Sequence, residues 1–162
     1  MTAAEDPRDE AFMRQTLAEA EAAIEAGQAP FGALVVDAAG AVVGQGYNLV
    51  RAEQDPTAHG EVVAIRRAWR RLGEKQAFGA CTLYTSCEPC LMCSCAIAQL
   101  GLGRVVFAAR GTDVPQVRRL FDADLTGAAT WAAGRRGWAM PETRGDFLRE
   151  EALRIMARFD WG

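Results

Sequence analysis

The sequence lacks any long apolar run. No stretch approaches the roughly 18 consecutive apolar residues of a membrane-spanning helix. Residues 1–10 have neither the basic head nor the apolar core of a secretory signal. Half of the residues are hydrophobic and 24% are charged, which is typical of a globular protein. These features argue against a membrane partner, and we expect a cytoplasmic protein.

An excess of positive charge is also missing. The net charge of −3 and the pI near 5.3 provide no general attraction to a phosphate backbone. This argues against a nucleic-acid partner without excluding tRNA, which a local basic patch can bind. No internal repeat, low-complexity tract or linker divides the chain. We therefore expect one domain, residues 1–162, with a single core.

Histidine is the scarcest metal-binding residue, and the cysteines are unevenly distributed. His59 is the only histidine, and all five cysteines fall within fifteen residues: Cys81, Cys87, Cys90, Cys93 and Cys95. A secreted disulfide framework would spread its cysteines along the chain to close loops. Clustered thiols in a reducing compartment more often bind a metal or take part in chemistry.

Apolar periodicity predicts the order helix, hairpin, helix, strand, helix, strand. Strands that alternate with helices favour an α/β layered domain with a partly parallel sheet. The expected helices are residues 9–26, 58–71, 89–100 and 146–159, with a short one at 114–120. The expected strands are residues 33–36, 41–43, 80–84 and 104–109, whereas 44–57 and 127–141 are expected to be irregular.

Two short motifs carry the chemistry. His59 opens one helix and Glu61 follows two positions later. Each has an ordinary explanation alone, since a single histidine is commonly a packed side chain and the helix dipole stabilises a first-turn carboxylate. Pro89 introduces the next helix, where Cys90 and Cys93 lie one turn apart near backbone donors that favour the thiolate. Together the motifs indicate a zinc site, because zinc accepts imidazole and thiolate ligands.

The number of ligands distinguishes a structural zinc site from a catalytic one. A structural site is closed by four protein ligands, whereas a catalytic site keeps a position for water. Cys87 and Cys95 are the candidates for a fourth ligand, but Cys87 lies on the strand side of the turn and Cys95 points away from the ligand face. The sequence thus predicts an open site with one Zn²⁺ per chain, held by His59, Cys90 and Cys93.

An open zinc site activates water. The metal lowers the pKa of a bound water from about 15.7 towards 7. Glu61, which is not a ligand, can accept the proton and hand it to a leaving group, a contribution of about 10²–10⁴-fold. Attack on an amino-substituted aromatic ring carbon, with loss of ammonia, needs no further cofactor. We therefore expect a hydrolytic deaminase with Glu61 as its catalytic acid and base.

At these residues the sequence resembles the cytidine deaminase superfamily, whose signature is H-x-E followed by P-C-x-x-C. The resemblance extends over residues 30–110. Residues 30–33, 46–48 and 55–59 resemble the branch of guanine deaminases and bacterial tRNA adenosine deaminases; residues 83–90 resemble guanine deaminases, and 104–110 are shared with the tRNA enzymes. The resemblance implies a three-layer α/β/α cytidine-deaminase-like fold, with a mixed central sheet of about five strands and helices on both faces. Because relatives are dimers or larger, it also implies a homodimer.

The resemblance further implies roles around the substrate. Asn48 matches a residue that hydrogen-bonds the base, and Phe31 matches an aromatic that lines the pocket. Their alternative explanations are a turn residue and a core side chain. Asp122, or Asp124 in its place, matches an acidic residue that assists proton transfer. The C-terminal segment of guanine deaminases can close the pocket, and the candidates here are Phe159 and Trp161.

Two positions depart from the family pattern. Gly60 replaces a residue that is commonly alanine, beside the expected substrate. Gln99 stands at a helical position where guanine deaminases have a large aromatic. Both departures predict a base pocket that is roomier or more polar than in those enzymes.

Three functions are compatible with these residues. The leading hypothesis is a zinc hydrolase that releases ammonia from a small nucleobase-like substrate, namely guanine or a related purine, pterin or triazine. The second is a tRNA adenosine deaminase that forms inosine, and the third is a closed, non-catalytic zinc module. Arginines that would form a basic patch for tRNA, although solvated helix charges are their ordinary explanation, are Arg66, Arg67, Arg70, Arg71, Arg135 and Arg136.

Overall fold

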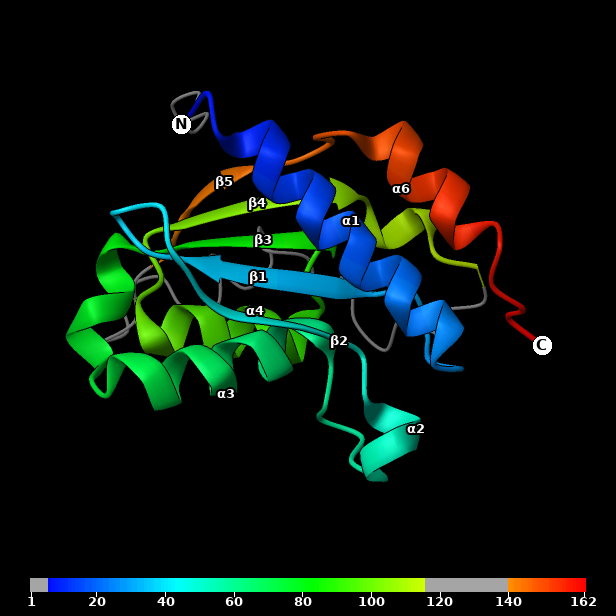
Figure 1. The fold of residues 1–162 in the computed structure, drawn as a ribbon, viewed down its shortest axis with the longest axis horizontal. Helices are drawn as coiled ribbons and strands as arrows, with labels where there is room; N and C mark the ends of the chain where they lie inside the picture. Colours follow the sequence, from blue (N-terminus) through cyan, green and yellow to red (C-terminus); the bar gives the residue numbers. More distant parts are fainter. Residues whose placement is uncertain (1–5, 116–139) are drawn as a thin grey trace.

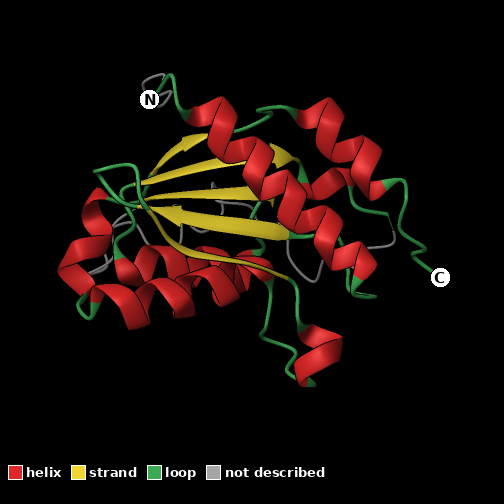
Figure 2. Ribbon diagram, viewed as in Figure 1, coloured by secondary structure: helices red, strands yellow, loops and turns green. Residues whose placement is uncertain are grey.

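One mixed sheet with helices on both faces forms the centre of the molecule (Figures 1 and 2). The computed structural model describes residues 6–115 and 140–162. The sheet has the order β2-β1-β3-β4-β5. Its strands are β1 (Gly32–Val36), β2 (Val42–Tyr47), β3 (Thr82–Cys87), β4 (Arg104–Ala109) and β5 (Glu142–Arg144). The predicted three-layer α/β/α fold is confirmed.

The helices divide between the two faces. One face is covered by α1 (Asp9–Glu25) and α6 (Arg149–Met156), and the other by α3 (Gly60–Leu72) and α4 (Leu91–Leu100) (Figure 1). The short α2 (Val50–Glu53) projects from the segment between β2 and α3, and short 3₁₀ helices follow α3 and β4 (Lys75–Ala80 and Gly111–Asp113). None of the described helices combines the length and the apolarity needed to cross a membrane.

Strand direction brings the expected functional loops to one edge of the sheet. β1 pairs antiparallel with β2 and β3, whereas β3, β4 and β5 run parallel. The carboxyl ends of β3 and β4 therefore meet, with Cys87 opposite Ala109. In open α/β sheets ligands bind beyond the carboxyl ends of the strands. The cysteine-containing loop follows β3 at this edge.

The alternation of side chains along the strands separates two cores. Leu34 and Val36 of β1 face α1 and α6, together with Tyr84 and Val106. The intervening residues face α3 and α4 and pack around Ile97 and Phe78. The first cluster includes Phe12, Met13, Leu17, Leu34, Val36, Tyr84, Cys87 and Val106, and the second includes Ala33, Val35, Ala64, Phe78, Leu83, Ile97 and Val105.

Most predicted elements are confirmed, including the first helix, the hairpin and the strand at residues 104–109. The irregular assignment of residues 44–57 is wrong, because β2 continues to Tyr47 and α2 follows. Gly44 in this stretch does not form a turn but lets β2 pack closely against α3, because a Cβ on Gly44 would lie 2.2 Å from the Ala64 carbonyl oxygen. The strand at 80–84 instead spans Thr82–Cys87, because Cys87 continues the pairing with β4.

Other helix and strand boundaries also differ from the predicted ones. α4 begins at Leu91, two residues after Pro89, and α6 is shorter than the predicted helix at 146–159. β5 was not predicted, since three half-buried residues become a strand only through pairing with β4. Residues 116–120 of the predicted short helix, and residues 127–139 of the predicted irregular stretch, lie outside the described residues.

Candidate zinc and active site

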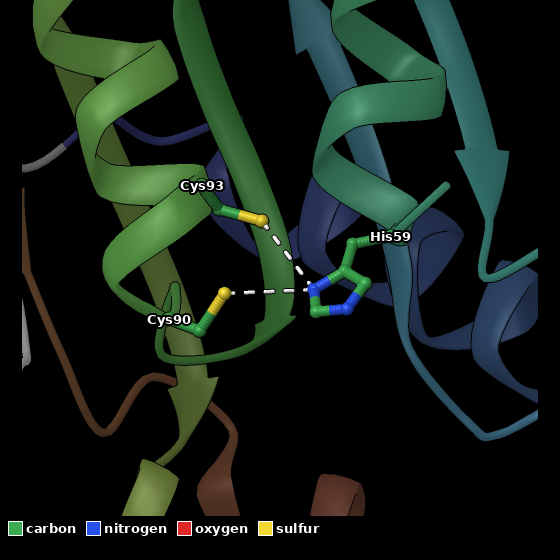
Figure 3. A group of neighbouring side chains, drawn as sticks. All are labelled: His59, Cys90 and Cys93. Carbon is green, nitrogen blue, oxygen red and sulfur yellow. Dashed lines mark hydrogen bonds between the residues drawn. The ribbon is translucent and has the colours of Figure 1, made fainter. Parts of the chain in front are cut away.

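Three donor side chains converge between the first turns of α3 and α4. His59 and Cys90 are the residues that immediately precede these helices, both with extended backbone, and Cys93 lies in the first turn of α4. The Nδ1 atom of His59 is 3.5 Å from the Cys90 sulfur and 3.6 Å from the Cys93 sulfur (Figure 3). All three donor atoms lie within 4.8 Å of one another, so the group can hold a metal ion.

The spacing of these atoms fits zinc. Bonds of about 2.3 Å to sulfur and about 2.0–2.1 Å to nitrogen, at a tetrahedral angle, separate the two ligand atoms by about 3.6 Å. The two sulfur–nitrogen distances have this length. The hydrogen bond with Cys93, supported by His59, lowers the pKa of Cys90 to about 4. Cys90 is therefore prepared as a thiolate, the form that binds metal.

The remaining cysteines stay apart from this group. Cys87 is buried, its sulfur lies 3.7 Å from the Arg110 carbonyl oxygen, and burial raises the pKa of its thiol. Cys95 is half-buried and does not belong to the donor group. Every histidine and cysteine of the chain falls within the described residues, so no further imidazole or thiolate joins the group there. Cys87 and Cys95 do not close the site, as the helical geometry predicted.

Glu61 follows the donor His59 by two positions and is buried. Its residue is 6% exposed in the first turn of α3. Burial raises the pKa of Glu61 to about 7, and the charge of Cys90 acts in the same direction. The side chains of Glu61 and Cys93 interact, and each affects the pKa of the other. A carboxyl group with such a pKa can both accept and donate a proton near neutral pH.

The two residues expected to receive a base are joined directly. The Asn48 backbone N–H donates to the Phe31 carbonyl oxygen at 2.8 Å. The Asn48 side chain is buried, and its Oδ1 accepts the N–H of Val50 at 3.1 Å. The adjacent Leu49 N–H donates to the Ala58 carbonyl oxygen at 2.9 Å. These bonds hold the Phe31–Asn48 pair against the segment that presents His59.

The structure shows the surroundings of the two positions that depart from the family pattern. A Cβ on Gly60 would lie 2.5 Å from the Phe31 carbonyl oxygen, so the place of the missing methyl is already filled by backbone. Gly60 therefore adds no space at this position, and a more polar pocket stays a prediction. Gln99 is exposed in the last turn of α4, at the opposite end of the helix from Cys90 and Cys93.

The C-terminal aromatics reach Phe31. The Trp161 ring lies 6.0 Å from the Phe31 ring and 5.0 Å from the Phe159 ring, measured between centroids. The Trp161 indole N–H donates to the Met156 carbonyl oxygen, which fixes the tail after α6. Asp122 and Asp124, the candidates for assisting proton transfer, lie outside the described residues.

Two supporting residues were missed from the sequence. Ser86 Oγ accepts the Gly32 N–H at 3.0 Å and donates to the Pro30 carbonyl oxygen at 3.4 Å. Glu88 Oε2 accepts the Gly111 N–H at 2.9 Å and joins the loop after β3 to the loop after β4. Both stand in the same motif as the cysteines, but their partners are distant in the sequence and carry no recognisable signal.

Most of the predicted basic patch on α3 is engaged within the protein. Arg66 pairs with Asp55, 3.2 Å away, in the loop before His59. Arg67 and Arg71 donate to carbonyl oxygens of the edge strand β2, at 2.8 and 3.1 Å. Arg135 and Arg136 lie outside the described residues. These contacts favour the ordinary explanation of the α3 arginines as structural surface charges.

Comparisons with known proteins agree with this geometry. Residues 6–109 match the family described as "Cytidine and deoxycytidylate deaminase zinc-binding region". A tRNA-specific adenosine deaminase from Aquifex aeolicus is 42% identical over 100 residues, covering 62% of this chain and 65% of that protein. A guanine deaminase from Bacillus subtilis is 44% identical over 108 residues, covering 66% and 68%. A solved guanine deaminase structure from Nitrosomonas europaea has a TM-score of 0.75 at 27% identity, covering 97% of this chain and 85% of that one.

The fold and the donor set define a zinc-binding domain of the deaminase class. Because the family match covers well over half of its residues, the chain belongs to the cytidine and deoxycytidylate deaminase family. Zinc is accordingly its cofactor. The chain spans slightly less than two thirds of the length of the Aquifex aeolicus enzyme that it matches.

Proposed function

We propose that the chain is a zinc-dependent hydrolytic deaminase of a free amino-purine base, guanine or a close relative, with His59, Cys90 and Cys93 as zinc ligands. The proposal depends on one observation: the buried Glu61 carboxyl group lies beside three donor atoms spaced for a single tetrahedral zinc. Bound zinc supplies a nucleophile at neutral pH by lowering the pKa of a water molecule.

The protein's own side chains perform the remaining steps. Glu61 accepts a proton from the attacking water and returns it to the departing amino group. One C–O bond forms and one C–N bond breaks, so that the amino-purine and water become the oxo-purine and ammonia. Asn48 holds the ring with its side-chain N–H groups, because its Oδ1 accepts the N–H of Val50. Phe31 supplies an apolar wall, supported by Trp161.

Two features favour a free base over an anticodon loop. Among the α3 arginines, Arg66 is paired with Asp55, and Arg67 and Arg71 each use an N–H group to bind a β2 carbonyl oxygen, so these side chains have fewer N–H groups to offer a phosphate backbone. The C-terminal tail covers the Phe31 side of the site with Trp161, whereas an RNA loop needs open access for splayed bases.

A tRNA adenosine deaminase is the second candidate. It is favoured by the 42% identity to the Aquifex aeolicus tRNA enzyme. This function predicts binding of tRNA that weakens steeply with salt, together with inosine in the anticodon loop.

A substrate panel distinguishes the two candidates. The zinc-loaded chain is incubated with guanine, adenine, cytosine, a pterin, an amino-triazine, the corresponding nucleosides and tRNA. Ammonia and inosine are then measured. We expect ammonia from guanine or another free amino-heterocycle and no inosine in tRNA. Absence of turnover on every free base contradicts the proposal, and inosine formation establishes the second candidate instead.

A further inference from the structure

The strands β1 and β3 separate at the edge of the sheet where the candidate site lies. Their antiparallel pairing ends at Ala33 opposite Thr85, and one step further this register would place Gly32 opposite Ser86. Beyond this point β3 leads into the cysteine-containing loop, whereas β1 is preceded by Phe31. The segment that carries the cysteine ligands and the segment that carries the aromatic wall of the site therefore part at this position.

A side chain replaces the backbone pairing where the two strands part. The Gly32 N–H donates to Ser86 Oγ at 3.0 Å, and the Ser86 hydroxyl donates to the Pro30 carbonyl oxygen at 3.4 Å. These two partners belong to the two peptide units on either side of Phe31. Because Ser86 is only 1% exposed, its hydroxyl makes both bonds away from water.

One of these peptide units also reaches the base-binding asparagine. The peptide between Phe31 and Gly32 donates its N–H to Ser86. The carbonyl oxygen of the same peptide accepts the Asn48 N–H at 2.8 Å. A planar peptide unit fixes its N–H and its carbonyl group relative to each other. A shift at Ser86 is therefore transmitted through one peptide plane to Asn48.

We propose that Ser86 is a positioning residue that holds the Phe31–Asn48 pair in a fixed place relative to the cysteine-containing loop. The inference rests on the proposed function and deepens it, because it names the residue that orients the base-binding side of the site. Ser86 acts through the backbone around Phe31 and not on the substrate. Without its hydroxyl, the Gly32 N–H and the Pro30 carbonyl oxygen lose a buried partner, and the segment must shift to replace it.

The Ser86→Ala variant removes both bonds. We expect kcat/KM for the base to fall about 10- to 100-fold, because a misplacement of about 1 Å can cost 10²-fold. KM should rise more than kcat falls, since the variant disturbs the residues that hold the ring and leaves Glu61 and the zinc ligands in place. Zinc affinity, measured by competition with a chelator, should stay close to that of the wild type. Ser86→Thr keeps the hydroxyl and is expected to keep KM within about 3-fold of the wild type.

Tyr84→Phe is the matched control. Tyr84 precedes Ser86 by two positions, so both side chains lie on the same face of β3, and both are 1% exposed. The Tyr84 hydroxyl donates to Asp9 of α1 at 2.7 Å. This variant loses a buried hydrogen bond and lowers Tm, but its KM is expected to equal that of the wild type. An equal rise of KM in Tyr84→Phe and Ser86→Ala would overturn the positioning role, because general destabilisation would then explain both.

Amide hydrogen exchange tests the contact without turnover. The Gly32 N–H is expected to exchange slowly in the wild type, and at least about 10-fold faster in Ser86→Ala than in Tyr84→Phe. Fast exchange of Gly32 in the wild type, equal exchange in the two variants, or a KM in Ser86→Thr as high as in Ser86→Ala would each overturn the proposal.

The exchange measurement also separates this proposal from the proposed function. If the wild type deaminates no free base, the proposed function fails, while Gly32 exchange still decides whether Ser86 holds this segment. Should Ser86→Ala not fold, Gly32 exchange in the wild type decides the same point, because this N–H lies beyond the last β1–β3 pair and has Ser86 Oγ as its acceptor.

Discussion

Two buried carboxyl groups lie on opposite faces of the sheet, and their surroundings give them opposite acidities. Asp9, in the first turn of α1, accepts hydrogen bonds from Tyr84, Arg104 and Arg144. Burial acts to raise the pKa of Asp9, but the hydrogen bonds from Arg104 and Tyr84 outweigh it, and the pKa is lowered. Burial of Glu61, on the α3 face, raises the pKa of that group to about 7.

The contrast separates a structural charge from a reactive one. A buried carboxylate surrounded by donors stays ionised and joins the elements that supply them, here α1, β3, β4 and β5. A buried carboxyl group whose pKa lies near neutrality can gain and lose a proton during a reaction, and such groups cluster at functional sites. Burial alone therefore does not set the acidity of a carboxyl group: the donors around Asp9 outweigh it, whereas at Glu61 the effect of burial prevails.

Removal of the Glu61 carboxylate is expected to have the largest effect. In Glu61→Gln the rate of ammonia release should fall about 10²–10⁴-fold, because the amide cannot transfer the proton. Zinc content, measured by atomic absorption, should stay at one ion per chain. Loss of zinc in this variant would instead make Glu61 a ligand, and wild-type activity would exclude it from proton transfer.

Asp9→Asn should affect stability instead of chemistry. The free energy of unfolding, measured in urea at pH 7, is expected to fall by about 3–5 kcal/mol, because Arg104 and Arg144 lose the charge that pairs with them in a buried site. The activity of the folded fraction should be retained. Asp146→Asn is the control, since the side chains of its ion pair with Arg110 are 44% and 45% exposed and the pair should contribute less than about 1 kcal/mol.

The stability difference between wild type and Asp9→Asn should depend on pH. The pKa of Asp9 is lower in the folded protein than the value of about 3.9 in an unfolded chain. A carboxyl group whose pKa is lower in the folded protein stabilises the fold at pH values above its pKa in the unfolded chain. This stabilisation is lost as the pH falls through the pKa of the folded protein. Urea midpoints should therefore differ by a constant amount from pH 6 to 8 and converge below about pH 4. A constant difference down to pH 2 would contradict the ion-pair explanation.

Substitution of single cysteines distinguishes the core on the α1 face of the sheet from the donor group on the α3 face. Cys87 packs in the core beside α1 and α6, whereas Cys90 belongs to the donor group. Cys90→Ser should weaken zinc binding by more than about 100-fold, because even the outer partners of metal ligands are worth 10–100-fold. Cys87→Ser should retain the wild-type affinity in chelator competition. Equal losses in both variants would support the closed, non-catalytic zinc module.

Local motifs were sufficient to predict the donor group and the acid–base candidate. His59 and Glu61 at one helix start are close in sequence, and so are Cys90 and Cys93 at the next, so each pair could be predicted from helix geometry. The same holds for α1 and β4, whose apolar patterns match their packing. The precise helix start was less predictable, since Cys90 precedes α4 rather than lying inside it.

Contacts between distant segments could not be predicted in this way. The Asp9 cluster joins residues that are 75, 95 and 135 positions apart, and nothing in the local sequence of Tyr84, Arg104 or Arg144 indicates the shared partner. β5 likewise exists through its pairing with β4. Gly60 illustrates the limit most clearly, because the absent side chain suggested added space that the Phe31 carbonyl already fills.

The candidate metal ligands, the candidate acid–base residue and the α/β class could be predicted from the order of residues, because each motif depends on spacing within one helix turn or one strand. Folding of the chain decided which buried carboxylate is neutralised by arginines, where Asn48 and Phe31 meet Gly60, and how the C-terminal tail reaches the site. These features arise from packing between elements, where the position of one backbone oxygen depends on both helices beside it.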